Sequence, residues 1–155
     1  MPTLHKDFAD FLRLLGEHEV RYLVVGGYAV AFHGHPRYTG DLDLFVEASP
    51  ENAARLIEVY AAFGFKREEM KPALFTTPDN VVRIGHEPVR LEVLTGISGV
   101  AFVDAYARRV EVPVNDLVVP FISYADLIKN KTSTGRTKDA VDVETLQKRN
   151  RPTES

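Results

Sequence analysis

Residues 24–47, VVGGYAVAFHGHPRYTGDLDLFVE, decide the fold of this chain. The short apolar run at residues 21–25 is typical of a buried strand, and the glycine pair at 26–27 ends it in a tight turn. Residues 28–34 are predicted to form a helix, and residues 41–47 return as a second strand. This order of strand, glycine turn, helix and returning strand places the glycine turn and the start of the second strand at one end of one sheet.

Asp41 and Asp43 are the first candidate site residues, and they lie on the returning strand. Side chains alternate between the two faces of a strand, so both aspartates project from one face while Leu42 and Leu44 project from the other. Two adjacent carboxylates on a buried strand repel each other and lose hydration, and a divalent cation relieves this cost. Mg²⁺, or Mn²⁺ in its place, prefers carboxylate oxygen, so the pattern predicts a metal site for phosphoryl transfer.

Glu92 is the candidate third carboxylate of that site. Residues 81–94 are predicted to form two strands joined by a turn at 86–88, and Glu92 lies on the second of them. If that strand pairs beside the aspartate strand, Glu92 completes a three-carboxylate metal site. The alternative is that Glu92 only forms an ion pair with Arg90 or Arg83 on an exposed face of the sheet.

The glycine turn is a candidate phosphate site. Gly26 and Gly27 let the backbone approach a ligand closely, and the first helical N–H groups, expected at Tyr28 and Ala29, can donate hydrogen bonds to an anion. Arg37 lies in the sequence between this turn and the aspartates and is a further candidate for phosphate contact.

A local basic cluster lies near the C-terminus of this otherwise acidic chain, and it comprises Lys129, Lys131, Arg136 and Lys138. A turn is expected at residues 132–135, and it could present Lys131, Arg136 and Lys138 to a triphosphate. The alternative is a solvated helix end, because basic residues near a helix C-terminus are ordinary partners of the helix dipole.

Two further groups of polar residues have structural explanations. His33 and His35 are expected to cap or pack against a helix end rather than to bind metal, because an oxygen-rich magnesium site gains little from imidazole. Asp139 and Asp142 could orient Arg136 or Lys138, although their spacing is typical of an ordinary charged face of a helix.

The remaining elements follow from apolar periodicity and capping residues. Helices are expected at residues 3–18, with Thr3 as N-cap, and at 49–64, 101–109, 124–130 and 136–148, with extended pieces between 110 and 119 broken by Pro113 and Pro120. Together these elements predict a single domain over residues 1–149 and a disordered tail at residues 150–155.

The composition fits one folded domain that needs no disulfides. The 155 residues include no cysteine and carry a formal net charge of −3, which excludes a disulfide framework, thiolate metal sites and a global attraction to nucleic acid or membrane. No apolar segment is long enough to span a bilayer, and the N-terminus lacks the order of a signal peptide. We therefore expect a cytoplasmic protein with no membrane partner.

Three segments of the chain resemble the DNA-polymerase-beta-like nucleotidyltransferase superfamily. Residues 24–47 resemble its glycine turn followed by acid-x-acid, RLEVLTGI at 90–97 resembles its third-acid strand, and KNKTSTGRTKDAVDVETL at 129–146 resembles its C-terminal Lys...Arg-x-Lys-Asp element. The small bacterial AbiEii-type, or minimal, nucleotidyltransferases are the most similar members. The resemblance implies an α/β fold with a short mixed sheet flanked by helices and a short C-terminal helical element. It also implies magnesium and a nucleoside triphosphate as substrate.

Two functions are compatible with these features. The first is transfer of a nucleoside monophosphate to an acceptor hydroxyl on a small molecule, a protein or a tRNA end, and the resemblance also implies the toxin of a toxin–antitoxin pair. A tRNA acceptor has only the basic cluster in its favour. The second is a regulatory nucleotide-binding module with weakened catalysis, indicated by Gly27 where the superfamily often has serine and by Glu92 where aspartate is usual. The short chain leaves little room for an acceptor-binding helical domain, so a homodimer or a small helical partner is expected.

Overall fold

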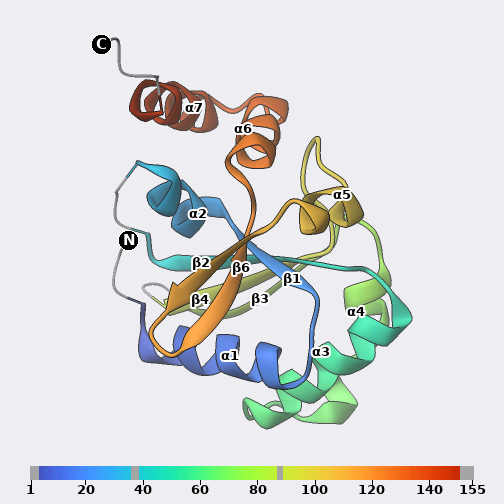
Figure 1. The fold of residues 1–155 in the computed structure, drawn as a ribbon. Helices are drawn as coiled ribbons and strands as arrows, with labels where there is room; N and C mark the ends of the chain where they lie inside the picture. The colour runs from blue at the N-terminus through green and yellow to red at the C-terminus, as the bar shows by residue number, and fades with distance from the viewer. Residues whose placement is uncertain (1–3, 36–38, 87–88, 151–155) are drawn as a thin grey trace.

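A six-stranded sheet in the order β3-β4-β2-β1-β6-β5 organises the chain (Figure 1). The computed structural model describes residues 4–35, 39–86 and 89–150. Its strands are β1 (Tyr22–Val25), β2 (Asp41–Val46), β3 (Val81–His86), β4 (Val89–Leu94), β5 (Val110–Val114) and β6 (Leu117–Phe121). β1 runs antiparallel to β2 and parallel to β6, and β2 runs parallel to β4. The sheet is therefore mixed, and the predicted α/β fold is confirmed.

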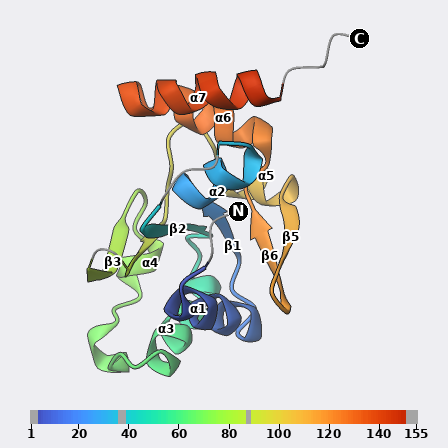
Figure 2. The ribbon, with the colours of Figure 1, turned by 90° about the vertical axis from the view of Figure 1, so that its left-hand side faces the viewer.

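Helices cover both sides of this sheet. They are α1 (Lys6–Glu17), α2 (Gly26–His33), α3 (Pro50–Ala62), α4 (Ala73–Thr76), α5 (Phe102–Ala107), α6 (Tyr124–Ser133) and α7 (Thr137–Arg149), with a 3₁₀ turn, η1, at Arg67–Glu69. Figures 1 and 2 show α1 and α3 on one side of the sheet and α2, α6 and α7 on the other. None of the helices described is both long and apolar enough to cross a bilayer.

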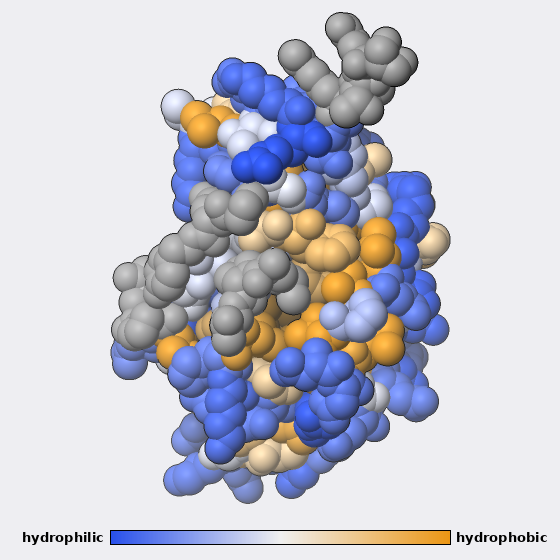
Figure 3. Space-filling model, turned by 60° about the vertical axis from the view of Figure 1, so that its left-hand side comes forward, coloured by the Kyte–Doolittle hydropathy of each residue, from blue (hydrophilic) through white to orange (hydrophobic). Residues whose placement is uncertain are grey.

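The core forms where the apolar stripes of the helices meet the apolar faces of the central strands. On α1, the side chains of Phe8, Phe11, Leu12 and Leu15 are buried, as their spacing predicts. Leu42 and Leu44 of β2 are also buried, on the face opposite the aspartates. On the molecular face drawn in Figure 3, apolar residues form a band across the middle, with hydrophilic surface above and below it.

The first helix begins later than its sequence suggests. Thr3 lies outside the described residues, and the N-cap of α1 is His5, whose Nδ1 accepts a hydrogen bond from the backbone N–H of Asp7 at 3.1 Å. The prediction of Thr3 as N-cap is therefore wrong. A neutral imidazole nitrogen can satisfy an unpaired N–H of the first helical turn in the same way as a hydroxyl.

Other elements also differ in extent from the predictions. α2 begins at Gly26, two residues early, and α6 continues through Ser133, so the turn before α7 is confined to the residues around Gly135. Residues 110–121 form one β5–β6 hairpin rather than broken pieces, and Pro113 is tolerated because β5 is the outer strand. α7 ends at Arg149, and Asn150 follows as its C-cap, whereas residues 151–155 of the predicted tail lie outside the described residues.

Candidate active site

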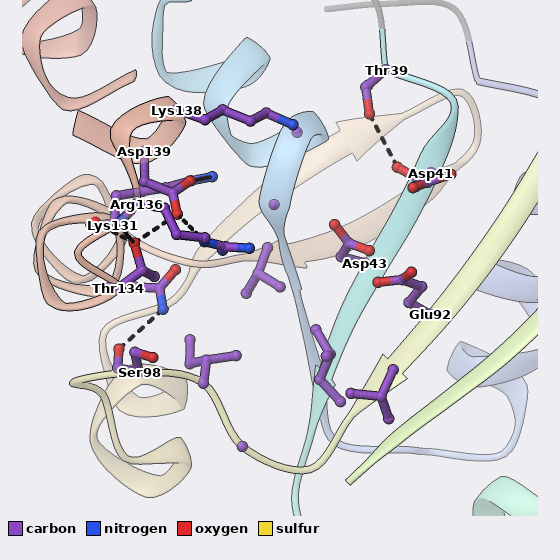
Figure 4. A pocket seen from close by; sticks show the side chains of 18 of the residues that line it. Thr39, Asp41, Asp43, Glu92, Ser98, Lys131, Thr134, Arg136, Lys138 and Asp139 are labelled. Carbon is purple, nitrogen blue, oxygen red and sulfur yellow. Dashed lines mark hydrogen bonds and ion pairs between the residues drawn. The ribbon is translucent and has the colours of Figure 1, made fainter. Parts of the chain in front are cut away.

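The acidic side chains come together through the parallel pairing of β2 and β4. Asp43 lies directly opposite Glu92 in the register, and Asp41 lies opposite Arg90. Asp41 and Asp43 share one face of β2, as the alternation of side chains predicts. Figure 4 shows the carboxyl groups of Asp43 and Glu92 pointing toward each other across the two strands. The predicted proximity of Glu92 to the aspartates is confirmed.

Two arginines accompany these carboxylates. Arg90 Nη2 lies 2.8 Å from Asp41 Oδ2, and Arg83 Nε lies 2.8 Å from Glu92 Oε1. Arg90 Nε is also 3.7 Å from Glu92 Oε1. The ion pairs considered as an alternative role for Glu92 therefore exist together with its position beside Asp43. They direct the carboxylates of Asp41 and Glu92 toward arginine.

The electrostatics of Asp43 fit a site that attracts cations. Burial raises the pKa of Asp43 to about 7, and the neighbouring carboxylates of Glu92 and Asp41 act in the same direction. Oδ1 of Asp41 and Oδ1 of Asp43 are buried and make no hydrogen bond within the described part of the chain. A hard divalent cation binds such oxygens, so these residues fit Mg²⁺ or Mn²⁺.

The carboxylates do not form a complete metal-ligand set in their present rotamers. Among residues 4–35, 39–86 and 89–150, no three acidic, histidine or cysteine side chains are arranged to hold a metal ion. The pairing of Asp41 with Arg90 and of Glu92 with Arg83 explains this. Metal binding would require these carboxylates to exchange an arginine partner for the cation.

The glycine turn brings backbone against the carboxylates. Gly26 has a φ of +66°, and a Cβ at this position would collide with the carboxyl group of Asp43. A Cβ at Gly27 would lie 2.5 Å from Oγ1 of Thr39. Both positions therefore exclude side chains, and the N-terminus of α2 lies directly beside the acidic residues.

The early start of α2 changes which N–H groups are available to an anion. In an α-helix the N–H groups of the first three residues have no intrahelical acceptor, so Gly26, Gly27 and Tyr28 are the donors of this end. Ala29 is the fourth residue of α2, and its prediction as a donor is wrong. Gly26 and Gly27 line the cavity described below, whereas the ring of Tyr28 is buried with its centroid 6.1 Å from that of Phe8.

Three residues of the basic cluster, Lys131 on α6, Arg136 at the N-cap of α7 and Lys138 on α7, form the opposite wall (Figure 4). Lys129 is not among the residues that line the cavity. Lys131 is only 7% exposed, and its Nζ lies 2.8 Å from Asp139 Oδ1 and 3.4 Å from Asp142 Oδ2. Arg136 Nε lies 2.7 Å from Asp139 Oδ2, with its side chain 71% exposed. Arg136 and Lys138 both line the cavity.

The aspartates of α7 are not an ordinary solvated face. Asp139 and Asp142 are each 2% exposed, so that prediction is wrong, and they join α6 to α7 through Lys131. Their spacing of three residues is the same for a solvated and a buried pair, so the sequence could not distinguish the two.

His33 and His35 contact groups on other elements of the fold, as expected of histidines that pack at a helix end. His33 Nε2 donates to the carbonyl oxygen of Ile122 at 2.8 Å, and His35 Nδ1 lies 3.3 Å from Asp142 Oδ1. Arg37, the remaining candidate phosphate contact, lies outside the described residues.

One cavity of about 1050 Å³ joins these groups. The predicted residues on its wall are Gly26, Gly27, Asp41, Asp43, Glu92, Lys131, Arg136 and Lys138. It is also lined by residues that sequence reasoning missed, among them Thr39, Asp79, Ser98 and Asn130. Thr39 lies two residues before Asp41, so strand alternation was a signal that could have identified it. The other three come from loops or helix ends, and no local pattern marks them.

Comparison with known proteins identifies the family. A family model described as "Nucleotidyl transferase of unknown function (DUF2204)" matches residues 4–154, almost the whole chain. The chain belongs to this family. The predicted nucleotidyltransferase superfamily is thereby confirmed, and the narrower AbiEii-type assignment stays a prediction. A comparison of this DUF2204 member with curated proteins found no significant match.

Two solved structures share the fold of this DUF2204 chain. The lincosamide antibiotic adenylyltransferase LnuA, solved with lincomycin bound, has a TM-score of 0.61 and 19% identity, over 95% of this chain and 98% of its own. A candidate nucleotidyltransferase from Thermotoga maritima, TM1012, has a TM-score of 0.60 and 16% identity, over 90% of this chain and 88% of its own. At these identities the likeness shows a common nucleotidyltransferase fold.

Proposed function

We propose that this nucleotidyl transferase moves a nucleoside monophosphate from a nucleoside triphosphate to an acceptor hydroxyl, using Mg²⁺ or Mn²⁺ held by Asp41, Asp43 and Glu92. The observation that carries the proposal is the register of Asp43 opposite Glu92, beside the N-terminus of α2 and within one cavity. Family membership supports the class of reaction.

The two walls of the cavity have different roles in this proposal. The N–H groups of Gly26 and Gly27 and the side chains of Arg136 and Lys138 bind the triphosphate, because helix N-termini and cationic groups attract phosphate. Lys131 is buried and forms an ion pair with Asp139, and Asp139 in turn pairs with Arg136 and orients its side chain. The cation supplies charge neutralisation at the reacting phosphate. The chain itself contributes mainly positioning, as in other phosphoryl transfers.

The reaction balances with groups at this site. The acceptor oxygen forms a bond to the α-phosphorus, the bond from that phosphorus to the bridging oxygen of pyrophosphate breaks, and the acceptor proton passes to a carboxylate. Glu92 is the candidate for this proton as a general base, and its alternative role is that of the third metal ligand. Pyrophosphate leaves along the basic wall.

Incubation with each NTP labelled in the α-phosphate tests the proposal. Wild type with Mg²⁺ should transfer label to an acceptor, and the double variant Asp41→Asn with Asp43→Asn should lose transfer, as should wild type with a chelator. Asp116→Asn is the control, because Asp116 is exposed and pairs with Arg13 outside the cavity. Transfer that persists in the double variant would contradict the proposal.

A regulatory module is the second candidate, and the ion pairs of Asp41 with Arg90 and of Glu92 with Arg83 favour it. It predicts metal-dependent NTP binding without transfer to any acceptor tested. The AbiEii type, the toxin role, a tRNA acceptor, a homodimer or small helical partner, and a cytoplasmic location stay predictions from the sequence.

A further inference from the structure

Thr39 is the hydroxyl-bearing side chain that faces the glycine turn. Its Oγ1 lies 2.5 Å from the point that a Cβ at Gly27 would occupy, and its own Cβ lies 2.9 Å from that point. Thr39 therefore fills the space where a side chain of residue 27 would begin. Figure 4 shows Thr39 just before β2, close to Asp41 and Asp43, and all three residues line the cavity.

The hydroxyl of Thr39 has a weak partner in the present structure. It donates to the carbonyl oxygen of Asp41 at 3.2 Å, which is long for a hydrogen bond between two oxygens. A hydrogen bond from a hydroxyl to a phosphate oxygen is charge-assisted and shorter, so a phosphate in the cavity would be the better acceptor. The proton can change partners by rotation of one side-chain bond, without movement of the backbone.

Groups that can bind an anion lie in the cavity together with Thr39. Gly27, whose N–H has no intrahelical acceptor, is next to Thr39, and Gly26 and Lys138 line the same cavity. A cation on the neighbouring carboxylates of Asp41 and Asp43 would offset their charge toward a phosphate. We infer that the Thr39 hydroxyl binds a phosphate of the nucleoside triphosphate, in the place that Gly27 leaves open. This inference rests on the proposed function, and it makes Thr39 a substrate-binding residue in addition to its contact with Asp41.

Thr39→Val and Thr39→Ser test the inference. Valine keeps the shape of threonine without its hydroxyl, and serine keeps the hydroxyl. Affinity for ATP, GTP, CTP and UTP is measured in turn by calorimetry with Mn²⁺ present. For each NTP that wild type binds, Thr39→Val should bind about tenfold to a hundredfold more weakly, the usual effect of removing a hydrogen bond to a charged group. Thr39→Ser should remain within about threefold of wild type, well inside the loss expected for a missing charged hydrogen bond.

Mn²⁺ binding without nucleotide separates phosphate contact from a purely structural role. If Thr39 acted only by positioning the backbone of Asp41, Thr39→Val would weaken Mn²⁺ binding as well as NTP binding. The inference predicts that the affinity of Thr39→Val for Mn²⁺, measured without nucleotide, equals that of wild type. Equal losses for Mn²⁺ and NTP would overturn it, and so would NTP affinity that does not change in Thr39→Val.

A relocated hydroxyl provides a second test. Because the Cβ of Thr39 would itself crowd a side chain at position 27, the exchange requires glycine at position 39. The double variant Gly27→Ser with Thr39→Gly should bind NTP more tightly than Thr39→Gly alone, whereas equal binding by two folded variants would overturn the inference. Wild type that binds no NTP would end the proposed function instead, so the two failures are distinguishable.

Discussion

Asp43 is a buried carboxyl group whose neighbours are two further carboxylates, and its pKa is raised from 3.8 to about 7. The folded protein therefore keeps the Asp43 proton up to about pH 7, whereas the unfolded chain releases it above pH 3.8. For this group, stability is greatest below pH 3.8 and falls as the pH rises through about 7.

Asp43→Asn removes this pH dependence. Each pKa unit corresponds to about 1.4 kcal/mol of free energy. The free energy of unfolding of Asp43→Asn minus that of wild type should therefore be larger above pH 7 than near pH 4, by on the order of 4 kcal/mol. Urea unfolding between about pH 4 and 8 with a chelator measures this. Asp116→Asn removes an exposed carboxylate paired with Arg13 and should not show the rise. A constant difference between Asp43→Asn and wild type across the range would contradict the argument.

At the scale of elements, α3 is fixed to the sheet by one buried amide. Asn52 is 1% exposed, and its Oδ1 accepts from the backbone N–H of Arg21 at 2.8 Å. Its Nδ2 donates to the carbonyl oxygens of Arg21 at 3.0 Å and of Glu47 at 2.9 Å. These three bonds tie the first turn of α3 to the start of β1 and the end of β2. They therefore fix β2, which carries the aspartates, against its neighbour β1.

Asn52→Ala should destabilise the fold by about 2–4 kcal/mol, because it removes the side-chain partner of the Arg21 N–H and of the Glu47 carbonyl oxygen. The Arg21 carbonyl oxygen keeps the backbone N–H of Glu47 at 3.2 Å. Asn52→Asp should be worse, since a carboxylate would face two carbonyl oxygens. Urea unfolding measures both, and Glu51→Ala, an exposed neighbour on α3, should change stability by less than about 0.5 kcal/mol. Equal stability of Asn52→Ala and Glu51→Ala would show that the amide does not hold α3.

The helices were predictable where a stripe of apolar residues and a cap agreed. α3 begins at Pro50 after the Ser49 cap, as its sequence predicts, and the apolar stripe of α1 is buried. The elements that were missed, η1 and α4, are a single 3₁₀ turn and a four-residue helix, too short to show periodicity. Pro113 was misleading, because its effect depends on whether the strand is at the edge, which is a property of the whole sheet.

At the scale of the whole molecule, metal and nucleotide binding should be linked to stability through the two walls of the cavity. A ligand at 100 times its dissociation constant stabilises the folded state by about 2.7 kcal/mol. Mg²⁺ and an NTP together should raise the melting temperature by more than the sum of their separate effects. The reason is that the positive charge of the cation and the negative charge of the triphosphate each favour binding of the other. Thermal unfolding with each ligand alone and with both measures this.

The variant that lacks both aspartates provides the contrast. Asp41→Asn with Asp43→Asn should show no joint effect of Mg²⁺ and NTP on the melting temperature. Asp116→Asn should retain the full effect. A joint effect that survives in the double variant would place the cation elsewhere.

The sequence by itself determined the strand, glycine turn, helix and acidic strand, and the common face of Asp41 and Asp43, because these follow from side-chain periods of a few residues. Only the tertiary structure decided that Asp43 lies opposite Glu92, that Lys131 is buried between Asp139 and Asp142, and that Thr39 occupies the space beside Gly27. These contacts join different strands, helices and turns. Their geometry is set by strand register and by the packing of helices on the sheet, which local sequence patterns do not encode.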